Sequence, residues 1–308
     1  MRKSLLIHPD ELSPKWIDRM ADLGVQVLAL HPAGGKTAHK SLMQMLELLE
    51  TEEYRALLDY AAEKGLEIEY ALHAASYLLP RALFETKPGL FRMDKAGARS
   101  PNLNFCASDP EAIQIVTERA AELAEKLYRS APRYHFWLDD DRDAKCFCPK
   151  CREKSASDQQ LSVMNAVLTA LREKMPEATL SYLAYFEAIE PPKTDKPLPG
   201  LFLEYAPFDR DMKQKAETMP EQEQENLRAL LRFFGCENAQ LLEYWYDNSM
   251  FSGWKKPPKP FAVNNENVKA DLRFYRDLGF EDVSCFACFL GPDYEALYGE
   301  PDLSAFRE

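Results

Sequence analysis

Long hydrophobic runs are absent from this sequence. Its longest apolar stretches have the length of a β-strand, far below the ~20 residues that a membrane-spanning helix needs. The first apolar stretch, Leu5–Ile7, is also too short for the core of a secretion signal. We therefore expect no membrane partner and a cytoplasmic protein.

Positive charge is scarce as well. The 308 residues include 38 Lys and Arg against 50 Asp and Glu, so the formal net charge is −12. No run of Lys and Arg supplies the basic patch that nucleic-acid-binding proteins carry. We expect no nucleic-acid partner, and the charge favours a neutral or cationic partner.

Several motifs of common enzyme classes are missing. Neither G-x-S-x-G nor H-E-x-x-H occurs. The segment Gly34-Gly35-Lys36-Thr37 lacks the earlier glycine that a phosphate-binding loop requires. We therefore expect no organic cofactor.

A disulfide framework is also not indicated. The chain has seven cysteines, an odd number, in a long sequence without secretion features. The cysteines are therefore expected to be reduced thiols, metal ligands or core residues.

Apolar runs alternate with helical patterns along the whole chain. Helix boundaries are marked by caps such as Ser13-Pro14 and by glycines such as Gly235. This alternation predicts an α/β fold, a single (β/α)8 barrel over residues 1–308. It has a long loop at 74–106 after the third strand and a cysteine loop at 141–156 after the fourth. The predicted strands are residues 5–8, 25–31, 66–73, 134–138, 179–186, 201–206, 239–246 and 283–290.

Carboxylates follow the fourth predicted strand. The segment Tyr134–Cys151 begins as a buried aromatic run and continues into three consecutive aspartates. Barrel enzymes place their sites at the carboxyl ends of strands. We therefore predict Asp140 as a catalytic general acid/base, supported by Asp139. The alternative is an acidic turn that ends the strand.

Two further acids lie inside apolar runs. Glu204 and Glu243 share the context Leu-Glu-Tyr in the sixth and seventh strands. Either can be the carboxylate partner of Asp140, as paired acids in glycosidases require. Alternatively, each is held structurally by an Arg or Lys.

Histidines and aromatic residues gather at the other strand ends. One such histidine is usually a satisfied polar residue, but His8, His31 and His73 end three successive strands. Sugars are bound by this mixture of polar and aromatic side chains. The predicted substrate-binding residues are His31, His73, Tyr185, Tyr246, Asp247 and Trp137.

The cysteine loop carries a metal-binding pattern. Cys146, Cys148 and Cys151 follow one another as C-x-C-x-x-C, and Cys106 precedes the third major helix near the same face. These four suit a structural zinc site. The alternative is a group of reduced, partly buried thiols.

A combination of motifs resembles the glycoside-hydrolase-like barrel family DUF4838, most clearly over residues 66–210. The motifs are Leu72-His73, Leu79-Pro80-Arg81, Phe91-Arg92-Met93-Asp94, Asn104-Phe105-Cys106, Trp137-Leu138-Asp139-Asp140, the three clustered cysteines, Ser157-Asp158-Gln159, Leu183-Ala184-Tyr185 and Leu203-Glu204-Tyr205-Ala206-Pro207. The resemblance implies a barrel near α-glucuronidases and β-hexosaminidases. It favours Glu204 over Glu243 as the partner of Asp140.

Three functions remain open from the sequence. The first is a glycoside hydrolase that acts on a small or trimmed saccharide through paired carboxylates. The second is a barrel that binds a carbohydrate without cleaving it. The third is a metal-dependent hydrolase that uses the histidines, although the first strand offers no H-x-H pair.

Overall fold

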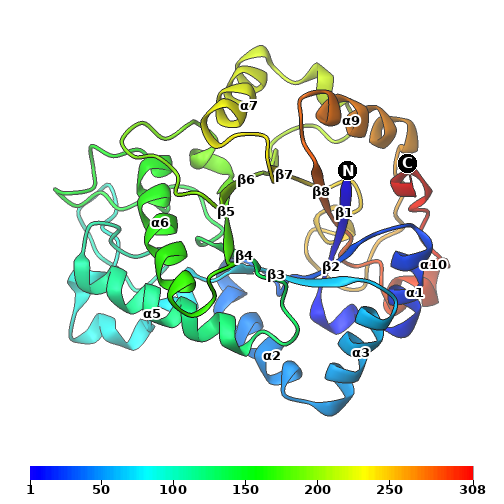
Figure 1. Ribbon diagram of the computed structural model, residues 1–308, viewed down its shortest axis with the longest axis horizontal. Helices are drawn as coiled ribbons and strands as arrows, with labels where there is room; N and C mark the ends of the chain where they lie inside the picture. Colours follow the sequence, from blue (N-terminus) through cyan, green and yellow to red (C-terminus); the bar gives the residue numbers. More distant parts are fainter. Residues whose placement is uncertain (308) are drawn as a thin grey trace.

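Eight parallel strands pair in chain order and close into one barrel, as the sequence predicts (Figure 1). The computed structural model describes residues 1–307. Leu6 lies beside Ala29 of the next strand and beside Phe286 of the last, which closes the ring. The strands are β1 (Arg2–Ile7), β2 (Val27–Leu30), β3 (Glu67–His73), β4 (Arg133–Trp137), β5 (Thr179–Ala184), β6 (Leu201–Tyr205), β7 (Gln240–Glu243) and β8 (Asp282–Phe286).

Helices surround the ring of strands (Figure 1). They are α1 (Pro14–Asp22), α2 (Ala38–Leu49), α3 (Glu52–Glu63), α4 (Ala75–Leu78), α5 (Pro110–Lys126), α6 (Ala156–Lys174), α7 (Glu221–Phe234), α8 (Asn248–Phe251), α9 (Asn265–Asp277) and α10 (Pro292–Tyr298). Within residues 1–307, none of them has the length and hydropathy that crossing a bilayer demands. The cytoplasmic location stays a prediction.

Local sequence explains where these helices begin. The Ser13 side chain accepts a hydrogen bond from the Trp16 amide, and Pro14 occupies the first helical position of α1. Asp109 caps α5 in the same way. The eighth strand is shorter than predicted and ends at Phe286, because the chain turns at Phe289, whose φ is 62°.

The long loop after β3 has its own structure. It contains α4, two short 3₁₀ helices and a bridge between Phe91 and Phe105. The Arg81 guanidinium donates to the carbonyl oxygens of Pro101 at 3.0 Å, Leu103 at 2.8 Å and Ala75 at 2.8 Å. One side chain therefore joins both ends of this loop.

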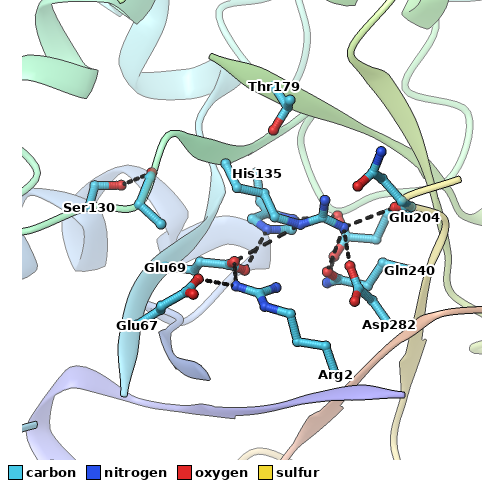
Figure 2. Close-up of polar contacts among 12 residues, drawn as sticks. Arg2, Glu67, Glu69, Ser130, His135, Thr179, Glu204, Gln240 and Asp282 are labelled. Atoms are coloured by element: carbon cyan, nitrogen blue, oxygen red, sulfur yellow. Dashed lines mark hydrogen bonds and ion pairs between the residues drawn. The ribbon is translucent and has the colours of Figure 1, made fainter. Parts of the chain in front are cut away.

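Charged residues fill much of the barrel interior, where branched apolar residues usually lie. Figure 2 shows His135 between two carboxylates. Its Nε2 is 3.0 Å from Glu69 Oε2, and its Nδ1 is 2.9 Å from Glu204 Oε2. All three side chains are buried.

Further side chains complete this interior network. Arg2 Nη2 donates to Glu69 at 2.7 Å, and Gln240 Nε2 donates to the second oxygen of Glu204 at 2.9 Å (Figure 2). Arg133 lies 3.0 Å from Asp282. A buried charge is tolerated when it is paired and hydrogen-bonded, which these contacts achieve.

The interior pairs alter the protonation of their members. Burial alone would lower the pKa of His135, but Glu204 and Glu69 outweigh it and raise this pKa to about 9. Burial opposes the charge on Glu69, but His135 and the neighbouring arginines lower its pKa to about 2. The centre of the barrel is therefore an imidazolium between two carboxylates near neutral pH.

This network predicts how stability depends on pH. The contribution of His135 is complete below its ordinary pKa of 6.5 and is lost as the pH rises through about 9. The contribution of Glu69 is complete above its ordinary pKa of 4.5 and is lost as the pH falls through about 2. Unfolding free energy measured by guanidinium titration should therefore be highest between these ordinary values and fall on the alkaline side by on the order of 1–3 kcal/mol.

The variant Glu204→Gln tests whether His135 causes the fall in unfolding free energy at alkaline pH. It removes one of the two charges that raise the pKa of His135, so the loss should end at a lower pH and be smaller. The exposed His39 serves as a control, since His39→Gln should leave the alkaline profile unchanged. A Glu204→Gln profile parallel to that of the parent protein would contradict the assignment to His135.

Candidate functional site

A cavity of about 1160 Å³ opens at the carboxyl ends of the strands. Its wall includes a residue that ends or directly follows seven of the eight strands. They are His8, His31, His73, Trp137, Tyr185, Tyr244 and Phe286. This is the end of a parallel barrel at which enzymes of this architecture place their sites.

Asp140 lines the cavity, as predicted. Its Oδ1 accepts a hydrogen bond from the Tyr185 hydroxyl at 3.0 Å. Burial is the main cause that raises the pKa of Tyr185, so this phenol stays a donor. A methyl group on Gly34 would lie 3.1 Å from Asp140 Oδ2 and 2.8 Å from the His73 ring. Because Gly34 has no side chain, Asp140 and His73 can hold these positions without a clash.

Asp247 lines the same cavity from the segment after β7. Its Oδ1 accepts from the Ser249 amide at 3.0 Å, the Ser249 hydroxyl at 2.5 Å and the Met250 amide at 3.3 Å. Burial raises the pKa of Asp247, against the lowering effect of these hydrogen bonds and of His8. The carboxylate is fixed in position by α8 and by its own turn.

Tyr244 lines the same cavity and was missed from the sequence. It is buried in the cavity wall and stacks on Phe286, with ring centroids 5.1 Å apart. Burial raises the pKa of Tyr244 well above its ordinary value, and the charges of Asp140 and then Asp247 add to this effect. The tyrosine therefore lies within electrostatic reach of both carboxylates. The predicted residue, Tyr246, packs on Phe306 and does not line the cavity.

Three histidines form a row along the cavity wall. Nδ1 of His8 is 2.8 Å from the His31 carbonyl, Nδ1 of His31 is 2.8 Å from the Ala71 carbonyl, and Nδ1 of His73 is 2.7 Å from the Leu138 carbonyl. A carbonyl oxygen only accepts, so each Nδ1 carries a proton. In its neutral form, such a ring is left with Nε2 as an acceptor. Burial, followed by the neighbouring histidines, lowers the pKa of His31 well below its ordinary value.

Trp137, a predicted substrate-binding residue, also lines the cavity, and Glu204 binds its indole from the interior of the barrel. The indole Nε1 donates to Glu204 Oε2 at 2.7 Å, the same oxygen that faces His135. Glu204 itself does not line the cavity. The expectation that it faces Asp140 across a cleft is therefore not met, because Trp137 lies between it and the cavity wall.

The side chain of Glu243 points out of the barrel, toward α9. Its Oε1 accepts from Arg210 Nε at 2.8 Å and from the Tyr275 hydroxyl of α9 at 2.9 Å, and it does not line the cavity. The structural alternative, a partner arginine, is the one observed. The shared Leu-Glu-Tyr context was misleading, because Glu204 pairs with Gln240 rather than with Glu243. An offset of three residues places the two glutamates on opposite faces of the sheet.

Asp139 does not face the main cavity either. Its Oδ1 accepts from the Ser76 amide at 3.1 Å, and its own amide donates to Asn104 at 2.8 Å. Burial raises the pKa of this carboxyl, against the effect of Arg81. Asp139 therefore joins β4 to the loop after β3, and a supporting role beside Asp140 is not seen.

Trp254 was missed by the sequence reasoning. It lines the cavity with 64% of its surface exposed, among six exposed large apolar residues. The residue lies in an irregular stretch between α8 and α9, where no strand pattern directed attention to it. An exposed indole at the mouth of a polar cavity suits stacking against the apolar face of a sugar ring.

The four predicted cysteines, from the loops after β3 and β4, lie close together. Their sulfur atoms all lie within 4.8 Å of one another, and all four are buried. Gln159 of α6 holds the cysteine loop through the Cys146 amide at 2.9 Å and the carbonyls of Cys146 and Cys151 at 3.0 Å each. This set could hold a metal ion. Across residues 1–307 it is the only group of three or more His, Cys, Asp or Glu side chains that could do so.

Comparisons with known proteins agree with this architecture. The family model described as a domain of unknown function, DUF4838, matches residues 40–283. No curated protein matches the chain in sequence.

Solved glycoside hydrolases share the fold. A β-galactosidase from the psychrophilic Marinomonas ef1 is 15% identical with a TM-score of 0.53, over 92% of this chain and 54% of that one. A GH5-4 broad specificity endoglucanase from an uncultured bacterium is 9% identical with a TM-score of 0.53, over 96% and 83%. An exo-β-1,4-mannosidase from Opitutaceae bacterium strain TAV5 is 15% identical with a TM-score of 0.52, over 100% and 58%. At these identities the likeness establishes the barrel fold, and the chain spans about half of the first of these proteins.

The position of Glu243 yields a prediction for stability. Glu243→Leu leaves Arg210 with one carboxylate instead of two, so the free energy of unfolding should fall by roughly 3–5 kcal/mol. Asp141→Asn, at an exposed acid, should cost less than about 0.5 kcal/mol. Urea unfolding measures both, and a loss below about 1 kcal/mol for Glu243→Leu would contradict the structural role.

Proposed function

The chain belongs to the DUF4838 family, and from the geometry of its cavity we propose that it is a glycoside hydrolase acting on a small or trimmed saccharide. One observation carries the proposal: Asp140 after β4 and Asp247 after β7 line one cavity together with aromatic side chains. Glycoside hydrolysis requires two carboxyl groups beside the scissile bond and a surface that accepts sugar rings.

In this proposal Asp140 protonates the glycosidic oxygen. The Tyr185 hydroxyl fixes one oxygen of the carboxyl, which leaves the other to face the substrate. Asp247 is the opposing carboxylate that stabilises or attacks the developing oxocarbenium centre. Its three donors fix Oδ1, so Oδ2 is the oxygen available to the sugar. This assignment replaces Glu204 and Glu243 as partners of Asp140.

The surrounding side chains would bind the sugar. His31 and His73 offer acceptors for hydroxyl groups through Nε2, and Trp137 offers an indole face. Tyr244 takes the place expected of Tyr246, because it lines the cavity and its phenol stays protonated as a hydrogen-bond donor. Trp254 would stack on a ring at the cavity mouth.

Substitution of the two acids tests the proposal. On aryl glycosides with poor leaving groups, Asp140→Asn should lower kcat by roughly 10²–10⁴-fold, the usual share of a general acid, with little loss of stability. The loss should be much smaller with good leaving groups, which need no proton. Asp247→Asn should reduce turnover of both kinds of substrate.

Asp143→Asn is the matched control for these measurements. Asp143 lies three residues beyond Asp140 and does not line the cavity, and its side chain pairs with Lys95 at the surface. Unchanged turnover of the poor-leaving-group substrate by Asp140→Asn would exclude Asp140 as the acid. Binding of saccharides by the parent protein without any turnover would instead support a non-catalytic carbohydrate-binding barrel.

We further propose that Cys106, Cys146, Cys148 and Cys151 hold one structural zinc ion. The Cys106 sulfur lies 3.6 Å from that of Cys148 and 3.9 Å from that of Cys151. A tetrahedral site with Zn–S bonds of about 2.3 Å has sulfur separations of about 3.8 Å, so the spacing fits. The ion would join the loop after β3 to the loop after β4, next to the wall that carries Asp140.

Metal analysis tests this site. Protein purified without added metal should contain about one equivalent of zinc, and removing it with a chelator should lower the melting temperature. Cys148→Ser should lose the metal, whereas Cys236→Ser, at an exposed cysteine outside the cluster, should retain it. Less than about a tenth of an equivalent in the parent protein would contradict the proposal.

A further inference from the structure

The charged groups that line the cavity are mostly of one sign. Five carboxylates lie in its wall, and the only Arg or Lys among the lining residues that the structure describes is Arg142. The five are Asp10, Glu47, Asp140, Asp141 and Asp247. The ratio of five acids to one base in the wall exceeds the ratio of 50 to 38 in the whole chain.

Arg142 is already engaged. Its Nη2 lies 2.5 Å from Asp209 Oδ1, and its guanidinium lies 4.1 Å from the centre of the Phe186 ring. A substrate carboxylate would have to compete with Asp209 for this group. Lys256, near the rim, is likewise paired with Asp10 at 3.3 Å and Asp293 at 2.9 Å.

The histidines and carboxylates of the cavity wall add hydrogen-bond acceptors. Each of the three histidines donates its Nδ1 proton to a backbone carbonyl. A neutral ring therefore offers the cavity only an acceptor, its Nε2. Carboxylates are acceptors too. Sugar hydroxyls and ammonium groups supply the donors that such a wall needs, whereas a carboxylate or sulfate supplies none.

From these observations we propose that the cavity accepts uncharged and amino saccharides and rejects acidic ones, such as uronic acids and sulfated or phosphorylated sugars. The inference rests on the proposed function, because it names the substrate class of that same cavity. It separates this chain from the α-glucuronidases, near which the resemblance to DUF4838 places it. A buried anion without a charged partner is strongly disfavoured, and nearby carboxylates add repulsion.

Two matched sets of hexoses test the proposal. One set is glucose, glucosamine and glucuronic acid, and the other is galactose, galactosamine and galacturonic acid. Binding of each free sugar to the full chain is measured by calorimetry and by saturation-transfer NMR at neutral pH. Within the set that binds, the acid should bind at least about tenfold more weakly than its neutral parent, and the amino sugar at least as tightly. High salt should narrow this difference.

A pair of charge-reversed variants tests whether the acids of the cavity wall cause the weaker binding of acidic sugars. Glu47→Lys changes an exposed acid of the cavity wall and should narrow the difference between acidic and neutral sugar by about two- to fivefold. Glu63→Lys changes the net charge equally at an exposed acid of α3 outside the cavity wall, and it should leave the difference unchanged.

The outcomes separate this inference from the proposed hydrolysis. A uronic acid that binds as tightly as its neutral parent would overturn the inference and leave hydrolysis standing. Neutral or amino sugars that bind, while the corresponding aryl glycosides are not cleaved, would support the inference and overturn hydrolysis. Absence of binding by every sugar in both sets would overturn both.

Discussion

The hydrogen-bonded closure of β8 onto β1 is the constraint on which the rest of the structure depends. Once the ring is closed, each strand has one face toward the axis and one toward the helices, and successive residues alternate between them. A residue reaches the cavity only if it has the inward phase and lies near the carboxyl end of its strand. Trp137 and Tyr244 meet both conditions, whereas Glu243, beside Tyr244 in sequence, has the wrong phase.

The inward face carries two levels with different chemistry. Below, His135 and its two carboxylates form a compensated ionic centre inside the barrel. Above, Trp137 separates this centre from the cavity and is held by the same oxygen of Glu204. Glu204, which the sequence predicted as a catalytic carboxylate, thus holds a side chain of the cavity wall, whereas Asp140 and Asp247 line the cavity itself.

Much of the fold and part of the site were accessible from the sequence. Alternating apolar runs and capped helices predict eight strands and a barrel, because each pattern reflects a local period of the backbone. The positions of Asp140, His31 and His73 at strand ends follow from the same pattern. The spacing of the three clustered cysteines, with Cys106 in the preceding loop, predicted a group that the structure brings together.

The sequence by itself determined which segments are strands, although the predicted ends of β7 and β8 lie beyond the observed ends at Glu243 and Phe286. Only the tertiary structure decided the faces of the strand side chains and their partners. The register that pairs Glu204 with Gln240 is set by packing across the ring, so no local pattern distinguishes Glu204 from Glu243. Likewise, the turn at Trp245 and Tyr246 directs Tyr246 outward, and the irregular stretch after α8 brings Trp254 to the cavity mouth. These placements depend on contacts between residues far apart in the chain, which a single sequence does not display.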